Sequence, residues 1–376
     1  MKHLFRFPES ASHYMQASEK MRGISAAHTA LGSGVSFKPR VQGQDVLFWQ
    51  YPCKTEAAAW ALHATMERAP VRGGELHIYL GLPWATWIDV ANKRAPGDGV
   101  HQQVDRNTEI ARIRMLELRD SLLAARLRLR VHTVCQHIYW RQLVKTWCSM
   151  GVTDVWLSHC PQDEVVPGLA LHPWSLYAVN AQEADRNEGL FPVRPANVRT
   201  LLASFMGAHM PHYLSDIRPR LLALASEPGF TVRLTDRWHF ESLVYEHQIA
   251  GQALQPKPGE VQEMLDYNHL LADSVFALCP SGAGANTLRL WEALATGAIP
   301  VLLGVQPRLP EGGSLAAVDW SRVLLRVADA DLAQLPALLA GIPVAKRLQM
   351  QKAGQAAYQA VQAQRCFAAT DGEVTP

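Results

Sequence analysis

Two residues of opposite charge, Arg289 and Glu292, follow a loop of small residues at positions 281–285. Small side chains let a ligand approach the backbone closely, and free N–H groups at the start of a helix attract anions. Residues three apart on a helix share a face. The guanidinium can therefore face a diphosphate, while the carboxylate can accept hydrogen bonds from both hydroxyls of a ribose. The candidate ligand-binding residues of this stretch are Ser281, Gly282, Gly284, Asn286, Arg289 and Glu292.

The elements around this loop form a predicted βαβ unit. An apolar run covers 275–280, a helical pattern starts at Asn286 or Thr287 and stops at Gly297, and a second apolar run covers 298–303. Apolar runs without alternation are typical of buried parallel strands. Asn and Thr are common N-cap residues, and glycine often follows a helix. The alternative interpretation is an ordinary buried βαβ unit with a surface Arg–Glu pair and no ligand.

Two other nucleotide-binding signatures are excluded. The dinucleotide fingerprint G-x-G-x-x-G matches only at Gly282 and Gly284, because Thr287 occupies the third glycine position. The acidic residue expected about twenty positions further on is also missing. No GK[ST] motif of a P-loop occurs in the chain. The loop is therefore neither a convincing NAD site nor an ATPase site.

The same stretch resembles the nucleotide-sugar signature of the exostosin family of glycosyltransferases. The matching residues are Cys279, Pro280, Gly282, Arg289, Glu292, Ala293, Gly297, Ile299, Pro300 and Val301. The flanking matches are Phe205, Gly207 and Arg218 upstream and Leu309, Pro310, Asp319 and Trp320 downstream. The resemblance covers residues 196–330, and no family-specific feature precedes residue 150. It implies an α/β chain of GT-B architecture, with two Rossmann-like domains facing a cleft, and transfer from a nucleotide sugar, usually a UDP-sugar.

Composition fits a globular protein of two domains. The 376 residues are 48% hydrophobic and 19% charged, and the formal net charge of +2 gives no reason to expect nucleic-acid binding. Six cysteines lack a C-x-x-C pair or zinc-finger spacing, so we expect reduced thiols in a cytosolic protein. The first ten residues lack the apolar core of a signal peptide, and no apolar run approaches the about 18 residues of a membrane span. These observations favour a bacterial-type cytosolic member of the family.

Alternating strand and helix patterns predict an acceptor-binding domain at 1–190, a nucleotide-sugar-binding domain at 191–345, and a C-terminal helix and tail at 346–376. The polar, proline-bearing stretch 180–199 is the predicted linker. Predicted strands lie at 46–49, 75–82, 130–137, 154–159, 200–206, 230–234 and 323–327, and short extended pieces lie at 169–174 and 175–179. Predicted helices lie at 55–68, 105–126, 139–150, 214–226, 238–249, 261–272 and 343–366.

The predicted helix at 105–126 is amphipathic. Four arginines lie largely off its apolar stripe: Arg112, Arg114, Arg119 and Arg126. A basic face of this kind can dock on an anionic membrane surface. The alternative is a solvated face whose side-chain stems pack on the domain.

An inverting sugar transfer needs groups that hold the diphosphate and the nucleoside, and a base for the proton of the acceptor hydroxyl. Arg218 is a second candidate cation for the diphosphate, and His209 and His212, in the loop before it, are binding candidates of second rank. The base is expected at the end of the strand predicted at 154–159, because ligands of open α/β sheets bind outside the carboxyl ends of the strands. Its candidates are Glu164 and Asp163, with Asp89 and Glu183 as rivals.

A D-x-D motif at Asp329 and Asp331 matches the metal signature of the other glycosyltransferase fold. It stands beside a predicted helix start, where acidic residues are favoured. We interpret it as part of a helix cap, and the sequence predicts no metal site and no cofactor. The nucleotide sugar is a substrate.

The predicted function is a GT-B glycosyltransferase that moves a sugar, with inversion, from a UDP-sugar to an oligosaccharide or lipid-linked glycan acceptor. Surface polysaccharide or lipopolysaccharide synthesis in the cytoplasm, at the inner face of the plasma membrane, is the expected setting. Two alternatives stay open. One is a nucleotide-sugar epimerase of GT-B shape, which needs no acceptor. The other is a non-catalytic glycan-binding scaffold, and the intact Arg289 and Glu292 argue against it.

Overall fold

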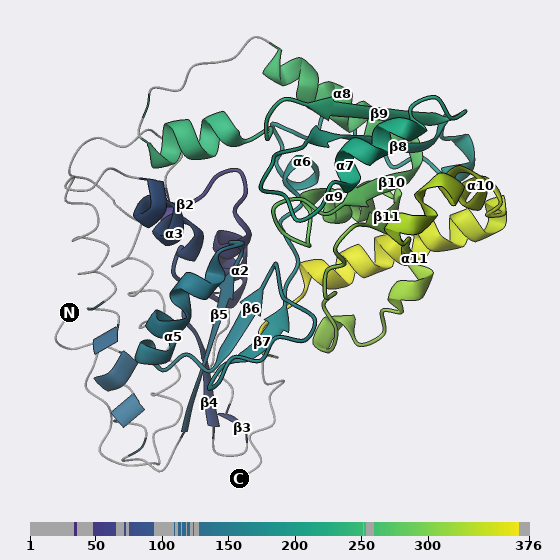
Figure 1. Ribbon diagram of the computed structural model, residues 1–376. Coiled ribbons are helices and arrows are strands. Elements are labelled where there is room, and N and C mark those ends of the chain that lie inside the picture. Colours follow the sequence, from purple (N-terminus) through teal and green to yellow (C-terminus); the bar gives the residue numbers. More distant parts are fainter. Residues whose placement is uncertain are drawn as a thin grey trace. The chain divides into compact units, whose positions relative to one another are not determined.

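The chain folds into two compact units. The computed structural model describes residues 34–35, 48–64, 71–72, 75–93, 128–250, 252 and 259–367, with short pieces between 109 and 123. Unit 1 comprises Met1–Trp174, Val244–Ala253 and Arg365–Pro376, and unit 2 comprises Ser175–Leu243 and Leu254–Gln364. Each unit contains its own five-stranded sheet of mainly parallel strands (Figure 1). The prediction of an α/β chain with two Rossmann-like domains is confirmed.

The sheet of unit 1 has the strand order β3-β4-β5-β6-β7. Its strands are β3 (Val71–Arg72), β4 (Glu75–Tyr79), β5 (Arg128–Cys135), β6 (Asp154–Leu157) and β7 (Ala170–Pro173). Pairing is antiparallel between β3 and β4 and parallel from β4 to β7. The other elements are β1 (Gly34–Val35), β2 (Phe48–Trp49), α2 (Thr55–Ala64), α3 (Trp84–Lys93), η3 (Trp140–Leu143) and α5 (Val144–Met150). Because β4, β5 and β6 are parallel, the residues that follow them meet at one edge of the sheet.

The predicted basic helix at 105–126 lies largely outside the described residues. Among its described residues, Arg112 pairs with Glu109, and Arg119 pairs with Asp120, both at the surface. Exposed pairs of this kind contribute little to stability. No helix in the described ranges has the length and apolar character that a bilayer crossing requires.

The sheet of unit 2 is entirely parallel, with the order β12-β11-β10-β8-β9. Its strands are β8 (Leu201–Ala208), β9 (Phe230–Thr235), β10 (Ser274–Pro280), β11 (Ile299–Leu303) and β12 (Leu325–Arg326). Its α-helices are α6 (Val179–Gln182), α7 (Ile217–Arg220), α8 (Glu260–Asp273), α9 (Leu288–Thr296), α10 (Leu335–Ala340) and α11 (Val344–Gln362). Shorter helical turns are η4 (Ala196–Val198), η5 (Leu221–Leu224), η7 (Gly313–Leu315), η8 (Trp320–Arg322) and η9 (Asp329–Gln334). The π-helix η6 (Ser242–Ile249) begins in unit 2 and ends in unit 1.

The predicted βαβ unit is present as β10, α9 and β11. Thr287 is the N-cap of α9, and Gly297 ends the helix in the left-handed region with φ of 71°. A β-carbon on Gly297 would lie 2.7 Å from Val193 Cγ1, so both the backbone and the packing require glycine there. Along β10, Phe276 and Leu278 join one apolar cluster of unit 2, and Ala277 and Cys279 join the other. The strand is therefore buried on both faces, which explains why its sequence does not alternate.

The unit boundary differs from the predicted linker at 180–199. Unit 2 already begins at Ser175, and within it the backbone N–H of Asn180 donates to Glu292 in α9 at 2.9 Å. The helix α11 also packs in unit 2, where Ala357 and Val361 join the cluster that contains α9. The predicted extended piece at 175–179 belongs to no strand of the sheet and leads into the short helix α6.

Candidate functional site

Arg218, in α7, braces the loop that follows β10. Its Nε donates to the carbonyl of Ser281 at 2.9 Å, and its Nη1 donates to the carbonyl of Ala208 at 2.6 Å. Its Nη2 donates to the carbonyl of Pro280 at 3.4 Å. Burial lowers the pKa of Arg218 to about 10. One guanidinium thus joins the ends of β8 and β10, which lie at the carboxyl edge of the parallel sheet.

The small-residue loop is held by backbone bonds as well as by Arg218. The N–H of Ser281 donates to Leu303 O at 3.0 Å, and the N–H of Gly282 donates to Gly284 O at 3.0 Å. Ser281 Oγ accepts the N–H of Val305 at 3.2 Å. A β-carbon on Gly282 would lie 2.7 Å from Arg218 Nη2. Glycine at position 282 is therefore explained by the close approach of this arginine, since its φ is not in the left-handed region.

Arg289 is buried at the start of α9. Its guanidinium carbon lies 4.9 Å from the ring centre of Phe205 and 4.5 Å from that of Tyr267. Its Nη2 donates to the carbonyl of Met206, but its Nη1 is buried without a hydrogen-bond partner. The alternative interpretation without a ligand predicted that Arg289 lies at the surface. This prediction is wrong, because only 5% of the residue's surface is accessible.

Arg218 and Arg289 form a pair of like charges over one ring. The guanidinium carbon of Arg218 lies 5.6 Å from the centre of the Phe205 ring, against which Arg289 also rests. The charge of Arg289 adds to the lowering of the Arg218 pKa, after burial as the main cause. In the described part of the chain, neither guanidinium has a carboxylate at ion-pair distance. Two largely buried cations without an anion form a site that a multiply charged anion would complete.

Glu292 is buried one turn further along α9. Its Oε1 accepts the backbone N–H of Asn180 at 2.9 Å, and its Oε2 accepts the hydroxyl of Tyr267. Its carboxylate therefore does not pair with Arg289, although the two residues share a helix face. The sequence does not point to Tyr267 or Asn180, because neither stands in a recognisable motif. Tyr267 reaches the site through the packing of α8, and Asn180 through the packing of α6.

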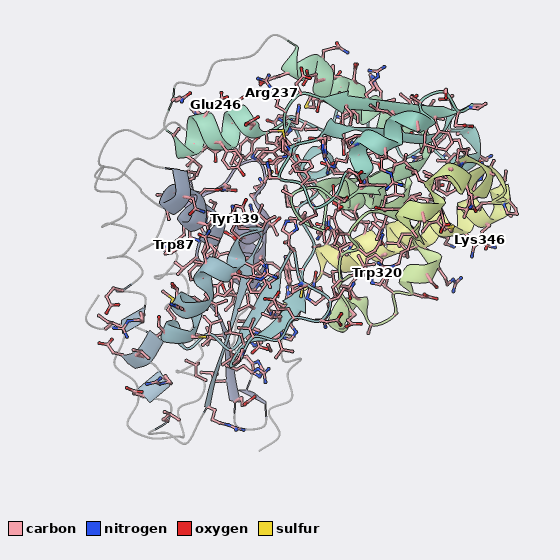
Figure 2. The ribbon with its side chains drawn as sticks, viewed as in Figure 1. Trp87, Tyr139, Arg237, Glu246, Trp320 and Lys346 are labelled. Atoms are coloured by element: carbon pink, nitrogen blue, oxygen red, sulfur yellow. The ribbon has the colours of Figure 1, made fainter. Side chains whose placement is uncertain are left out.

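The other candidates of the loop have different surroundings. Asn286 Oδ1 accepts the indole N–H of Trp291 and the N–H of Thr287, both at 2.9 Å, so this side chain stabilises the start of α9. Trp291 in turn packs edge-on against Trp320, which is labelled in Figure 2. His209 has its Nδ1 buried without a partner, and His212 is exposed. Of the residues predicted to bind the anion, Arg218, Arg289 and the loop around Gly282 lie close together. The side-chain oxygen of Asn286 instead accepts hydrogen bonds from within the protein.

The predicted base candidates occupy distinct places. In unit 1, Glu164 is held by Arg141, which donates from Nε to Oε1 at 2.9 Å and from Nη2 to Oε2. Asp163 beside it is exposed. Both follow β6 at the carboxyl edge of the sheet, as predicted. Asp89 is buried and accepts from Gln50, while Glu183 lies in unit 2 and accepts the hydroxyl of Tyr177 at 2.5 Å.

A buried carboxyl that the sequence analysis did not single out lies at the same edge of unit 1. Glu56 Oε1 accepts the N–H of Gln136 at 3.0 Å, and both of its oxygens accept the N–H of Ala85 in α3. Burial raises the pKa of Glu56 to about 8. Glu56 is the second residue of α2, and acidic residues are common in the first turn of a helix. The sequence therefore gives no sign that this carboxyl is buried.

The D-x-D motif lies in the first turn of η9 (Asp329–Gln334), beside the helix start that the sequence predicts. Asp329 Oδ1 accepts the backbone N–H of Gly304 at 2.9 Å, and Arg220 lies 3.8 Å from Asp329 Oδ2. In the described part of the chain, no group of three or more His, Cys, Asp or Glu side chains could hold a metal ion. Asp329 thus connects the end of β11 with the beginning of η9.

Comparison with known proteins finds a family match in the second half of the chain. Residues 178–342 match the Exostosin GT47 domain. The chain is 25% identical over 168 residues to an exostosin-1 homolog of Caenorhabditis elegans, covering 45% of this chain and 40% of that protein. It is 31% identical over 154 residues to exostosin-1 of Drosophila melanogaster, covering 40% of this chain and 19% of that protein. The chain therefore spans less than half the length of these curated relatives.

Among solved structures, a GtfA/B complex aligns with 86% of this chain and 62% of its own, at 13% identity and a TM-score of 0.33. The sequence matches place the similarity in the second half of the chain, where residues 178–342 resemble the exostosin GT47 domain of glycosyltransferases. The match begins at residue 178, close to the start of unit 2 at Ser175, and includes Arg218, Arg289 and Glu292. The resemblance stated from the motif around Cys279 is thereby confirmed.

Proposed function

We propose that the protein is a glycosyltransferase that takes a sugar from a nucleoside diphosphate sugar, with UDP-sugars as its donors. The pair formed by Arg218 and Arg289 carries the proposal. Burying a charge without its partner is costly, and a diphosphate would supply both the opposite charge and acceptors for the free Nη1 of Arg289. The match of residues 178–342 to a GT47 domain supports the same function.

The chemistry follows from the charge that develops during transfer. As the bond between the sugar carbon and the diphosphate oxygen breaks, negative charge grows on the leaving diphosphate. Guanidinium groups already fixed at this place stabilise that charge without reorganising. Arg218 is fixed by three carbonyl groups and Arg289 by one carbonyl and two aromatic rings. In this proposal Glu292 accepts the ribose hydroxyls through lone pairs that Asn180 and Tyr267 leave unused.

A thermal-shift screen of nucleoside diphosphates and their sugars tests the function. A ligand present at a hundred times its Kd adds about 2.7 kcal/mol of apparent stability. We expect UDP to stabilise the protein, and product analysis with glycan acceptors then separates transfer from epimerisation. If no nucleoside diphosphate stabilises the chain, the donor site is wrong.

The ribose assignment predicts a loss of affinity in Glu292→Gln. Hydrogen bonds to a charged group contribute about 1.5–3 kcal/mol each, so UDP binding should weaken roughly tenfold to a few hundredfold. The glutamine keeps the shape, can accept from the N–H of Asn180, and can donate to the oxygen of Tyr267, so the fold should persist. Isothermal titration of UDP measures the effect. A Kd within about twofold of the parent would remove Glu292 from the ribose site.

We further propose that transfer requires no metal ion or other cofactor. Arg218 and Arg289 can neutralise the leaving diphosphate with protein charges alone. Asp329 is engaged with the N–H of Gly304, which supports a structural function for the D-x-D motif. Turnover is expected to continue in EDTA. Loss of turnover on chelation, reproduced by Asp329→Ala, would contradict this proposal.

For the acceptor we propose an oligosaccharide or lipid-linked glycan, bound by unit 1, with inversion at the transferred sugar. Glu164 and Asp163 remain the predicted base; to accept a proton, Glu164 must first leave Arg141. The six cysteines of the sequence form no C-x-x-C pair, and we propose a reducing compartment such as the cytoplasm. Peripheral contact with anionic lipid through the arginines at 105–126 is part of the same proposal.

A further inference from the structure

Tyr267, in α8, touches both charged residues of α9 at once. Its ring centre lies 4.5 Å from the guanidinium carbon of Arg289, and its hydroxyl donates to Glu292 Oε2. Burial raises the pKa of Tyr267 well above its usual value, so the hydroxyl keeps its proton and remains a donor. One side chain therefore presents its aromatic face to the cation and its hydroxyl to the anion.

Arg289 and Glu292 do not form an ion pair, which is unusual for an arginine and a glutamate at this spacing on a helix. Arg and Glu three positions apart on a helix ordinarily attract each other, and burial strengthens that attraction. Here the carboxylate of Glu292 is satisfied by Tyr267 and by the N–H of Asn180, while Arg289 Nη1 has no partner. Keeping the two charges apart leaves one cation for an anionic ligand.

We propose that Tyr267 is a positioning residue that prevents Arg289 and Glu292 from neutralising each other, so that each remains available to the nucleotide. The inference rests on the proposed donor site. Removing the hydroxyl frees Glu292 Oε2, and Arg289 Nη1, three positions away on the same helix face, is a buried donor without a partner. The resulting pair would take the cation from the diphosphate.

The test is Tyr267→Phe, which keeps the ring on Arg289 and removes only the hydroxyl. Inorganic pyrophosphate is the main probe, because it reports on the cations without a ribose, and UDP is the second. We expect both to bind roughly tenfold or more weakly, as loss of one charged hydrogen-bonding partner implies.

The decisive variant is Tyr267→Phe combined with Glu292→Gln. An amide cannot neutralise Arg289, so pyrophosphate affinity should return to within about twofold of the parent, while UDP affinity stays low. A merely structural function of Tyr267 would give no such recovery. The matched control is Tyr358→Phe, which removes another hydroxyl of unit 2 that accepts from Gln182 at 2.7 Å and should leave both affinities unchanged.

Three outcomes would overturn the inference. Unchanged pyrophosphate affinity in Tyr267→Phe would show that the hydroxyl is not needed. A double variant as weak as the single one would show that Glu292 does not capture Arg289. A parent protein that binds neither pyrophosphate nor UDP would contradict the donor site itself, and this result is distinguishable because it appears before any substitution is made.

Discussion

Replacing Arg289 by methionine should weaken UDP binding by at least about a hundredfold, because two charged hydrogen bonds at about 1.5–3 kcal/mol each are lost. The same substitution should leave the free protein as stable as before, to within about 1 kcal/mol, or make it more stable. Methionine fills the space between Phe205 and Tyr267 without a charge, and it removes the repulsion that acts on Arg218. Binding and stability should therefore change in opposite directions, as is common at functional sites.

The matched control is Arg199→Met in the same unit. Arg199 is also buried, but its guanidinium donates to Ser274 O at 2.8 Å, to Thr296 O at 2.5 Å and to other carbonyls. These carbonyls lie at the ends of α8 and α9, so Arg199 satisfies groups that the helices leave unpaired. Its loss leaves buried carbonyls without a donor and should cost about 1–3 kcal/mol for each of them, with UDP affinity unchanged in the folded fraction. Urea unfolding and isothermal titration measure both variants. A strongly destabilised Arg289→Met with normal UDP affinity would show that Arg289 is structural.

The sequence was sufficient to predict the βαβ unit around the loop, because the residues that determine this unit act locally. The uninterrupted apolar run of β10, the N-cap at Thr287 and the glycine at 297 each act within a few residues. The common helix face of Arg289 and Glu292 could be predicted for the same reason, since their spacing alone determines it.

The environment of those residues could not be predicted in the same way. Tyr267 lies 25 positions from Glu292, and Asn180 lies 112 positions away. Such contacts depend on how α6 and α8 pack against α9, for which no local pattern exists. The unit boundary was misplaced for the same reason, because a polar, proline-bearing stretch resembles a linker even where Asn180 binds a buried carboxylate.

In unit 1, His63 connects α2 with the end of the chain. Its ring stacks on Tyr79 with centres 4.2 Å apart, its Nδ1 lies 2.7 Å from Ala59 O, and its Nε2 accepts the N–H of Cys366 at 3.0 Å. Both nitrogens are thus used by the neutral ring, with the proton on Nδ1. Burial lowers the pKa of His63 to about 4, and the charge of Arg365 contributes to the lowering. Protonation of Nε2 would remove the acceptor of the Cys366 N–H.

The sign of the pH effect follows from this shift. The unfolded chain binds a proton at His63 below its usual pKa of about 6.5, whereas the folded chain does so only near 4. The stability that His63 contributes is therefore complete above pH 6.5 and is lost as the pH falls from about 6.5 towards 4, reaching a loss of about 2 kcal/mol at pH 5. Glu56, with its raised pKa, acts in the opposite direction over part of this range.

Comparing the parent with His63→Gln isolates the histidine, because Glu56 and the other titrating groups cancel in the difference. Glutamine can donate to Ala59 O or accept from the N–H of Cys366 but does not titrate, so it should be less stable than the parent at pH 7. That deficit should shrink by about 2 kcal/mol at pH 5, since only the parent loses the contribution of His63. Urea unfolding of unit 1 at the two pH values, followed by the fluorescence of its tryptophans, measures the difference. A deficit that is the same at pH 7 and pH 5 would mean that His63 is protonated equally in the folded and unfolded states, and that its contact with Cys366 does not depend on the neutral ring.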